Sequence, residues 1–320
     1  MPAHRTHPLR GYLFIASAAL FWGISATLGR AAFTGRLLPG GNSLAPIDPL
    51  ILSHSRVTLS LVVLLAALLA RRGAGALRVP PHDLLRFVLL GVLGVAASNY
   101  LYYFAIQRTS VATAIIIQYT APVWVLLYMV ARRAQRPSWR RTSAVGLAVA
   151  GCALAVGLVG SGGLRLDPLG VAAALLAAFS FAFYNVGGHS VLARYDRWKV
   201  LFWVLAAASA FWLLVNPPWK VLAAHYGREQ WAFMGVFSVL SVLLPFSCYF
   251  AGLQHLEPTR AIVASCLEPV FSIVIAAFAL GELLKPVQIV GILLVLVAIV
   301  GIQLPERPAR GDELLVEPIE

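Results

Sequence analysis

Ala264-Ser265-Cys266-Leu267-Glu268-Pro269-Val270-Phe271 lies in the middle of an apolar run that extends from about Thr259 to Leu280. A carboxylate at the depth of a lipid bilayer is costly, so Glu268 needs a partner, a proton or a water-filled cavity. Pro269 removes a backbone donor and predicts a kink in a helix that spans the membrane. A kinked helix that carries an acid at mid-depth indicates a pathway for a solute.

The composition of the chain excludes an ordinary soluble protein. Its 320 residues are 60% hydrophobic and 12% charged, and the mean hydropathy is +0.82. Soluble domains are about half apolar and about a quarter charged. The long apolar runs and short basic loops predict an all-α polytopic membrane protein whose first partner is the lipid bilayer. The Lys and Arg residues that give the net charge of +12 lie between hydrophobic segments. The positive-inside rule explains this distribution better than nucleic-acid binding does.

We predict ten transmembrane helices with both termini in the cytoplasm. The predicted spans are 11–33, 49–70, 84–106, 110–131, 142–160, 168–190, 199–215, 231–253, 258–280 and 286–304. With the N-terminus inside, 17 of the 25 Lys and Arg residues fall in cytoplasmic segments and 7 fall on the opposite side, while Arg56 lies within a span. This excess of positive charge sets the predicted orientation.

The chain also repeats itself. A shift of 147 residues aligns 102–123 with 249–270 without a gap, and six of the 22 pairs are identical, including Pro122 with Pro269. Each unit holds five predicted spans, an odd number, so the second unit enters the membrane in the opposite sense. Two inverted halves with a binding site between them near the midplane are a common plan of transporters.

This repeat predicts the division of the chain. The predicted segments are a cytoplasmic N-terminus at 1–10, a first five-helix repeat at 11–160, a second five-helix repeat at 161–304 and a disordered cytoplasmic tail at 305–320. The paired prolines carry more weight in this alignment than paired alanines, since identities between apolar residues arise by chance in apolar sequence.

Several short stretches resemble the EamA branch of the drug/metabolite transporter superfamily. They are Ala19-Leu20-Phe21-Trp22-Gly23, Ser55-Arg56, Thr120-Ala121-Pro122-Val123, Leu267-Glu268-Pro269-Val270-Phe271, Gly281-Glu282 and Gln288-Ile289-Val290-Gly291. The resemblance covers roughly 11–304. One departure is visible, because the Gly281-Glu282 pair has no counterpart in the first half, where the aligned residues are Ala134-Gln135-Arg136.

The resemblance implies a ten-span carrier of small metabolites in a bacterial inner membrane. Export of amino acids and related metabolites is the best-known activity of such proteins, and the aromatic amino-acid exporters share this plan. The resemblance defines the class of protein more firmly than the substrate.

Glu268 is the first candidate for substrate binding. Ala261, Ser265, Glu268 and Ser272 are spaced 4, 3 and 4 residues apart, which predicts one small and polar helix face. Glu268 on this face would bind a substrate amine or carry a proton. The alternatives are a structural ion pair with Arg56 or a protonated interior acid. Arg56 would bind a substrate carboxylate or, alternatively, anchor its helix by reaching towards the membrane surface.

Polar and aromatic side chains in four other spans complete the candidate site. Trp22 and Ser25 share a helix face, as do Phe181 and Tyr184, and such a face suits either a cavity wall or close packing. Amide and phenol groups at membrane depth need hydrogen bonds from other helices or from a solute. The full set of predicted binding residues is Trp22, Ser25, Asn99, Tyr103, Gln118, Phe181, Tyr184, Asn185, Ser265 and Glu268, with helix kinks at Pro122 and Pro269.

The sequence lacks the motifs of the enzymes that we considered. It holds no phosphate-binding glycine loop, no Gly-x-Ser-x-Gly and no His-Glu-x-x-His. The three cysteines all fall in predicted spans, at spacings unlike a zinc site or a disulfide framework. We therefore expect no cofactor, no metal and no enzymatic activity.

We hypothesise a secondary transporter that exports amino acids or related metabolites by alternating access. An importer or facilitator of another small polar solute, such as a sugar, a nucleoside or a cationic drug, is the alternative. A membrane scaffold and an intramembrane enzyme are the competing classes. Proton exchange through Glu268 and facilitated diffusion both stay open as mechanisms, and we expect a monomer or a weak homodimer.

Overall fold

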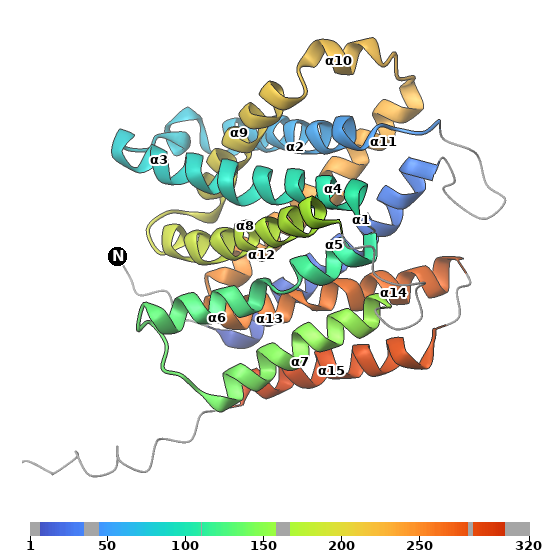
Figure 1. Cartoon of the computed structure of the whole chain (residues 1–320). Coiled ribbons are helices and arrows are strands. Elements are labelled where there is room, and N and C mark those ends of the chain that lie inside the picture. The colour runs from blue at the N-terminus through green and yellow to red at the C-terminus, as the bar shows by residue number, and fades with distance from the viewer. Residues whose placement is uncertain (1–6, 35–44, 110, 158–166, 281–283, 305–320) are drawn as a thin grey trace, which may run out of the picture.

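A computed structural model of the chain describes residues 7–34, 45–109, 111–157, 167–280 and 284–304 (Figure 1). Every regular element in these ranges is helical. The predicted boundary at residue 160, the Gly281-Glu282 pair and the predicted tail at 305–320 lie outside the described residues.

The helices up to residue 157 follow the first five predicted spans closely. They are α1 (Pro8–Thr34), α2 (Pro49–Arg72), η1 (Ala74–Leu77), α3 (Pro81–Leu89), η2 (Leu90–Ala96), α4 (Ala97–Arg108), α5 (Val111–Gln118), α6 (Ala121–Ala131) and α7 (Trp139–Val156). α3, η2 and α4 form one continuous span, whereas α5 and α6 are two parts of an interrupted span. α1 begins at Pro8, slightly before the predicted start at 11.

The helices after residue 167 follow the last five predicted spans. They are α8 (Pro168–Leu192), α9 (Arg197–Val215), α10 (Pro218–Ala223), α11 (Arg228–Ser238), η3 (Val239–Leu243), α12 (Leu244–Leu253), α13 (Pro258–Ser265), α14 (Leu267–Leu280) and α15 (Pro286–Gln303). α11, η3 and α12 form one continuous span, and α13 with α14 forms another interrupted one.

Nine helical segments in the described part of the chain are long and apolar enough to cross a membrane. α7 is not among them, because Arg140 and Arg141 in its first turn lower its mean hydropathy. The chain is thus an all-helical, multi-pass membrane protein, while the tenth span at α7 stays a prediction.

The packing of the helices before residue 157 is repeated after residue 167. α1 packs against α12, α13 and α14, and α8 packs correspondingly against α4, α5 and α6. η2 contacts α9 as η3 contacts α2. α2 packs on α9, and α7 lies beside α15 at the edge of the bundle (Figure 1). This exchange of equivalent neighbours is what a two-fold relation between the halves requires.

α7 and α15 approach each other closely through glycine. A Cβ atom added to Gly291 of α15 would lie 2.4 Å from the backbone nitrogen of Ala155 and 2.7 Å from the carbonyl oxygen of Gly151. No side chain therefore fits at residue 291 without separating the helices. Small residues at such contacts are typical of helix pairs in membranes, because they allow the backbones to touch.

Both halves deviate from regular α-helix at equivalent places. η2 and η3 are π-helical turns inside the third and eighth spans. The fourth span is interrupted at Tyr119 and Thr120, and the ninth at Cys266, which the 147-residue shift pairs with Tyr119. π-helical turns and interrupted helices often occur at functional sites, because they free backbone groups and redirect side chains.

Candidate functional site

Glu268 lies in the first turn of α14, directly after the interruption at Cys266. Pro269 follows it, in a turn where the missing backbone N–H of proline costs little. The unpaired N–H groups and the dipole of a helix N-terminus favour negative charge. The interruption of the ninth span thus places Glu268 at a helix end where the dipole partly offsets the cost of burying an acid.

Glu268 lies near polar groups from other helices. The phenol of Tyr119, at the interruption between α5 and α6, lies within interaction range of the Glu268 carboxyl group. The guanidinium group of Arg56, from α2, and the phenol of Tyr102, from α4, lie within electrostatic range of the same carboxyl group. One carboxylate from the second half thus faces polar groups of the first half.

Arg56 is oriented by Asn99 of α4. The guanidinium group donates a hydrogen bond to Oδ1 of Asn99, and Nδ2 of Asn99 donates to the carbonyl oxygen of Val95 at 2.7 Å. Val95 belongs to the π-helical turn η2. The Arg56 guanidinium carbon lies 5.9 Å from the ring centre of Tyr103. Nε of Arg56 is buried and has no hydrogen-bond partner, so one N–H donor of the guanidinium group is left unpaired.

Five side chains of this region keep part of their surface accessible. Tyr102, Tyr119 and Glu268 are enclosed by protein, yet each retains some accessible surface. Arg56 and Gln118 are likewise only partly buried. A side chain needs such residual accessibility if it is to contact water or a small solute.

We call Arg56, Asn99, Tyr102, Tyr103, Tyr119 and Glu268 the polar cluster. Gln118 lies at its edge. Its Nε2 lies 3.4 Å from the hydroxyl of Ser98, and that hydroxyl donates to the carbonyl oxygen of Ala177 at 3.3 Å. The structure thus brings Asn99, Tyr103 and Gln118 near Glu268, as neighbouring parts of the third and fourth spans.

Three further predicted residues, Trp22, Phe181 and Tyr184, form an aromatic cluster together with Phe246 and Tyr249. The ring of Tyr249 lies 5.4 Å from Trp22, 6.3 Å from Phe181 and 5.8 Å from Tyr184. Trp22 and Phe181 are partly accessible, whereas Tyr184 is only 2% exposed. Tyr184 therefore packs in the core, while the first two rings retain surface for a ligand.

Asn185 joins the aromatic cluster through a hydrogen bond. Its Nδ2 donates to the hydroxyl of Tyr249. Asn185 is fully buried, and its Oδ1 has no partner. The amide therefore holds α8 to α12 and leaves one acceptor unpaired.

Ser25 and Ser265 direct their hydroxyl groups at backbone. Ser25 donates to the carbonyl oxygen of Phe21 at 2.6 Å and lies 3.2 Å from that of Leu240, and Ser265 donates to Ile262 at 2.8 Å. Both serines are buried. The single polar face predicted from Ala261 to Ser272 is interrupted, since α13 ends at Ser265 and Glu268 lies in the first turn of the next helix, α14.

Two residues of the polar cluster are absent from the predicted set. Tyr102 and Tyr119 were recognisable as phenols at membrane depth, but sequence gave no reason to prefer them. Tyr119 immediately precedes the Thr120-Ala121-Pro122-Val123 stretch, and its place at the helix interruption is what turns it towards Glu268.

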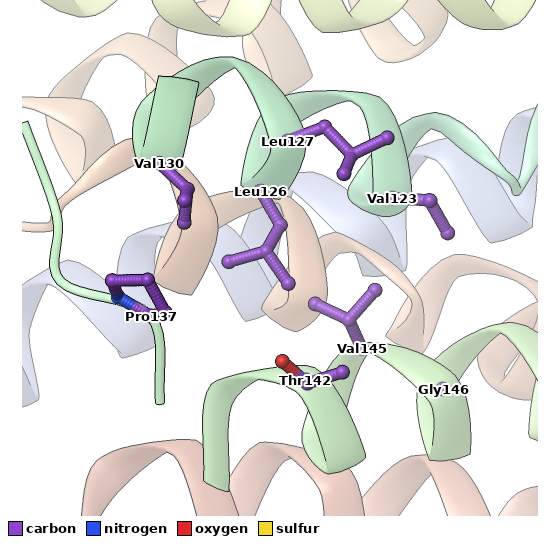
Figure 2. Close-up of a pocket in the computed structure, with 8 residues that line it drawn as sticks. All are labelled: Val123, Leu126, Leu127, Val130, Pro137, Thr142, Val145 and Gly146. Atoms are coloured by element: carbon purple, nitrogen blue, oxygen red, sulfur yellow. The ribbon is translucent and has the colours of Figure 1, made fainter. Parts of the chain in front are cut away.

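A groove on the surface of the bundle differs from the polar cluster in position and in the chemistry of its lining. It lies between α6 and α7 and has a volume of about 340 Å³ (Figure 2). Its lining is made of Val123, Leu126, Leu127, Val130, Pro137, Thr142, Val145 and Gly146. The groove offers no charged group to a polar solute, and Leu127 and Gly146 are exposed on its rim. Such a surface suits lipid acyl chains rather than a transported metabolite.

The helical fold and the enclosed charged cluster define a polytopic membrane protein of the kind that moves small solutes. In the described ranges, no three His, Cys, Asp or Glu side chains gather at one place. Comparison with known proteins gives the same class of protein. The model of the EamA-like transporter family matches residues 9–157 and again 168–304. The chain belongs to this family.

Named relatives are transporters as well. The chain is 29% identical over 275 residues to the threonine/homoserine exporter RhtA of Escherichia coli K12, covering 84% of this chain and 88% of RhtA. It is 23% identical over 227 residues to the inner membrane transporter YicL of Salmonella typhimurium, covering 70% and 75%. A protein of known crystal structure shares the fold with a TM-score of 0.73 and 19% identity, covering 92% of this chain and 97% of that one.

Proposed function

We propose that this protein exports amino acids or related metabolites across the bacterial inner membrane. It works by alternating access between two inverted five-helix halves, with both termini in the cytoplasm. The observation that carries the proposal is the polar cluster, in which Glu268 of the second half lies within electrostatic range of Arg56 of the first half. The similarity to RhtA, whose name states export of threonine and homoserine, supports amino acids as the substrate class.

The two charges suit the two ends of an amino acid. Glu268 binds the ammonium group, and Arg56 binds the carboxylate through its free donor. Tyr119 and Asn99 hold these two side chains in place. A zwitterion bound in this way bridges the halves and neutralises both buried charges, which a neutral sugar or a simple cation does not do.

Glu268 has a second role if export is coupled to protons. A carboxyl group that is exposed to each side in turn exchanges a proton for the substrate amine. In facilitated diffusion the same group is only a polar contact. These two mechanisms predict different responses to an imposed pH gradient.

Transport in proteoliposomes tests the proposal. Purified protein should exchange radiolabelled threonine or another amino acid, and Glu268→Gln should lower the rate by at least about 30-fold, since removing one partner of a buried charge pair costs about 2–5 kcal/mol. Glu229→Gln, at an exposed carboxylate of α11, is the matched control and should leave the rate unchanged.

A pH gradient separates the two mechanisms. Concentrative uptake that follows the gradient in the unmodified protein and disappears in Glu268→Gln indicates proton exchange. Uptake that only equilibrates indicates a facilitator. If Glu268→Gln transports at the normal rate with the normal response, Glu268 has no role in the carrier.

A further inference from the structure

The loop between α6 and α7 is tied to the start of α13 through a buried glutamine. Nε2 of Gln135 donates to Oε2 of Glu257 at 3.0 Å, and Oε1 of Gln135 accepts from the hydroxyl of Thr259 at 2.8 Å. Gln135 is 6% exposed and Thr259 is 1% exposed. Arg141 of α7 approaches the same carboxylate oxygen at 3.8 Å.

The chemistry of the partners fixes the direction of both bonds. An ionised Glu257 only accepts hydrogen bonds, so the NH₂ group of Gln135 must face it. The carbonyl oxygen of Gln135 then faces Thr259, whose hydroxyl donates to it. Both polar ends of the amide are satisfied, and removing either partner leaves a buried polar atom without a bond.

These bonds join the two halves on one face of the membrane. Gln135 belongs to the first half, whereas Glu257 and Thr259 begin the ninth span in the second half, the same span that carries Glu268. The predicted topology assigns this face to the cytoplasm. In alternating access, contacts between halves on one face must break before the site opens to that face.

We propose that Gln135, Glu257 and Thr259 form a latch that closes the cytoplasmic entrance to the site and are further functional residues of the transport cycle. The role in transport rests on the proposed function, but the latch itself is a property of the two halves. Rupture of the latch frees the N-terminal end of α13 to move away from the α6–α7 loop. Glu268, at the next interruption of that span, then becomes accessible from the cytoplasm.

The latch gives a reason why the Gly281-Glu282 pair has no counterpart in the first half. The 147-residue shift pairs Gln135 with Glu282 of the Gly281-Glu282 pair. A glutamate at residue 135 would place a second carboxylate about 3 Å from Glu257, where the two charges repel. An amide at this position donates to Glu257 instead. The latch therefore favours a glutamine at residue 135, where the aligned position of the second half has a glutamate.

Pulsed electron paramagnetic resonance measures the latch without any ligand. Spin labels at Arg132→Cys and Ala193→Cys occupy exposed positions in different halves on this face. Cys152 and Cys266 are buried, so only Cys248 needs replacement by alanine. The protein in lipid nanodiscs should show one dominant distance between the labels.

Gln135→Glu should increase the fraction of molecules with a longer distance by about fivefold or more, because the bond to Glu257 is replaced by repulsion. Gln135→Glu combined with Glu257→Gln should restore the original distance, since the reversed pair makes the same two bonds. Thr259→Val, which keeps the shape of the side chain, should open the latch to a lesser extent. Arg72→Gln breaks the exposed ion pair with Asp196 on the same face and should change nothing.

An unchanged distance distribution in both Gln135→Glu and Thr259→Val overturns the latch. Failure of the reversed pair to restore the distance, in a variant that unfolds at the normal temperature, overturns it as well. Neither outcome affects amino-acid transport in proteoliposomes, so the latch and the proposed function fail separately.

Discussion

The interruption between α5 and α6 and the interruption between α13 and α14 are equivalent in backbone and different in charge. Each is followed within the first helical turn by a proline, Pro122 in one and Pro269 in the other. The residue before the proline is Ala121 in the first half and Glu268 in the second. The same backbone device thus carries a charge in only one of its two copies.

This difference shows which parts of the molecule the repeat determines. Equivalent packing, such as the α7–α15 contact, builds the bundle from two similar halves. The charged residues of the polar cluster differ between the halves, because the first half supplies Arg56 and the second half supplies Glu268. Variants at repeated features should therefore change stability, and variants at the charged features should change transport.

Moving the carboxylate between the two interruptions gives the largest expected effect. The double variant Glu268→Ala with Ala121→Glu keeps the number of charges but removes the acid from its partners Tyr119 and Arg56. We expect amino-acid exchange in proteoliposomes to fall by at least about 30-fold, the cost of a lost buried partner. Retained transport would mean that the two interruptions are interchangeable.

A methyl group at the α7–α15 contact should lower stability without altering recognition. Gly291→Ala forces backbone atoms apart, and overpacking of this kind costs about 1–3 kcal/mol. Thermal unfolding in detergent should therefore occur at a lower temperature. Gly301→Ala, in the same helix where nothing lies within 4 Å of the added atom, is the control and should be neutral or slightly stabilising. A neutral Gly291→Ala would contradict the close contact.

Loss of the Tyr119 hydroxyl should have a smaller effect on transport. Tyr119→Phe removes the hydroxyl that lies near Glu268 and keeps the ring, and a hydrogen bond from this hydroxyl to a charged group would contribute about 1.5–3 kcal/mol. We expect the half-saturating concentration of substrate to rise by about tenfold. Tyr128→Phe, at an exposed phenol of α6, is the matched control. Equal behaviour of the two variants would remove Tyr119 from the site.

The smallest expected effect is a change in stability at the hydrogen bond between Tyr195 and Asp83. Tyr195, in the loop between α8 and α9, donates a hydrogen bond to Asp83, and this bond raises the pKa of the phenol above its ordinary value of 10.0. The bond therefore contributes stability below pH 10 that is lost as the pH rises through the raised pKa. Thermal unfolding measured from pH 8 to pH 11 should show a weaker decline for Tyr195→Phe than for the unmodified protein. Parallel declines would mean that the bond does not form.

Much of the fold could be predicted from the sequence, because hydrophobic length specifies helices in a bilayer almost without regard to packing. The observed helices agree with the predicted spans at most of their ends. The count of ten is not established, since Arg140 and Arg141 make α7 less apolar than its neighbours. The positions of Glu268 and the prolines were visible in the sequence as a charge and two helix breakers.

Details of the site depend on where each helix is interrupted, which a periodicity argument does not reveal. The sequence placed Ser265 and Glu268 on one face, but the break at Cys266 leaves Ser265 bonded to its own helix. Tyr119 reaches Glu268 for the same reason, because its own helix is interrupted at that residue. The bond between Arg56 and Asn99 joins α2 to α4, so it depends on the tertiary arrangement of the helices, which the periodicity of one span does not report.

Competition by substrate analogues tests most directly the claim that Glu268 and Arg56 bind the two ends of one zwitterion. Exchange of radiolabelled threonine in proteoliposomes is measured against unlabelled threonine, against 1-amino-2-propanol, which lacks the carboxylate, and against 3-hydroxybutyrate, which lacks the amine. Threonine should compete at least about tenfold better than either analogue, because each analogue leaves one charge of the site unpaired. If the amine or the acid competes as well as threonine, the site does not hold both ends of an amino acid.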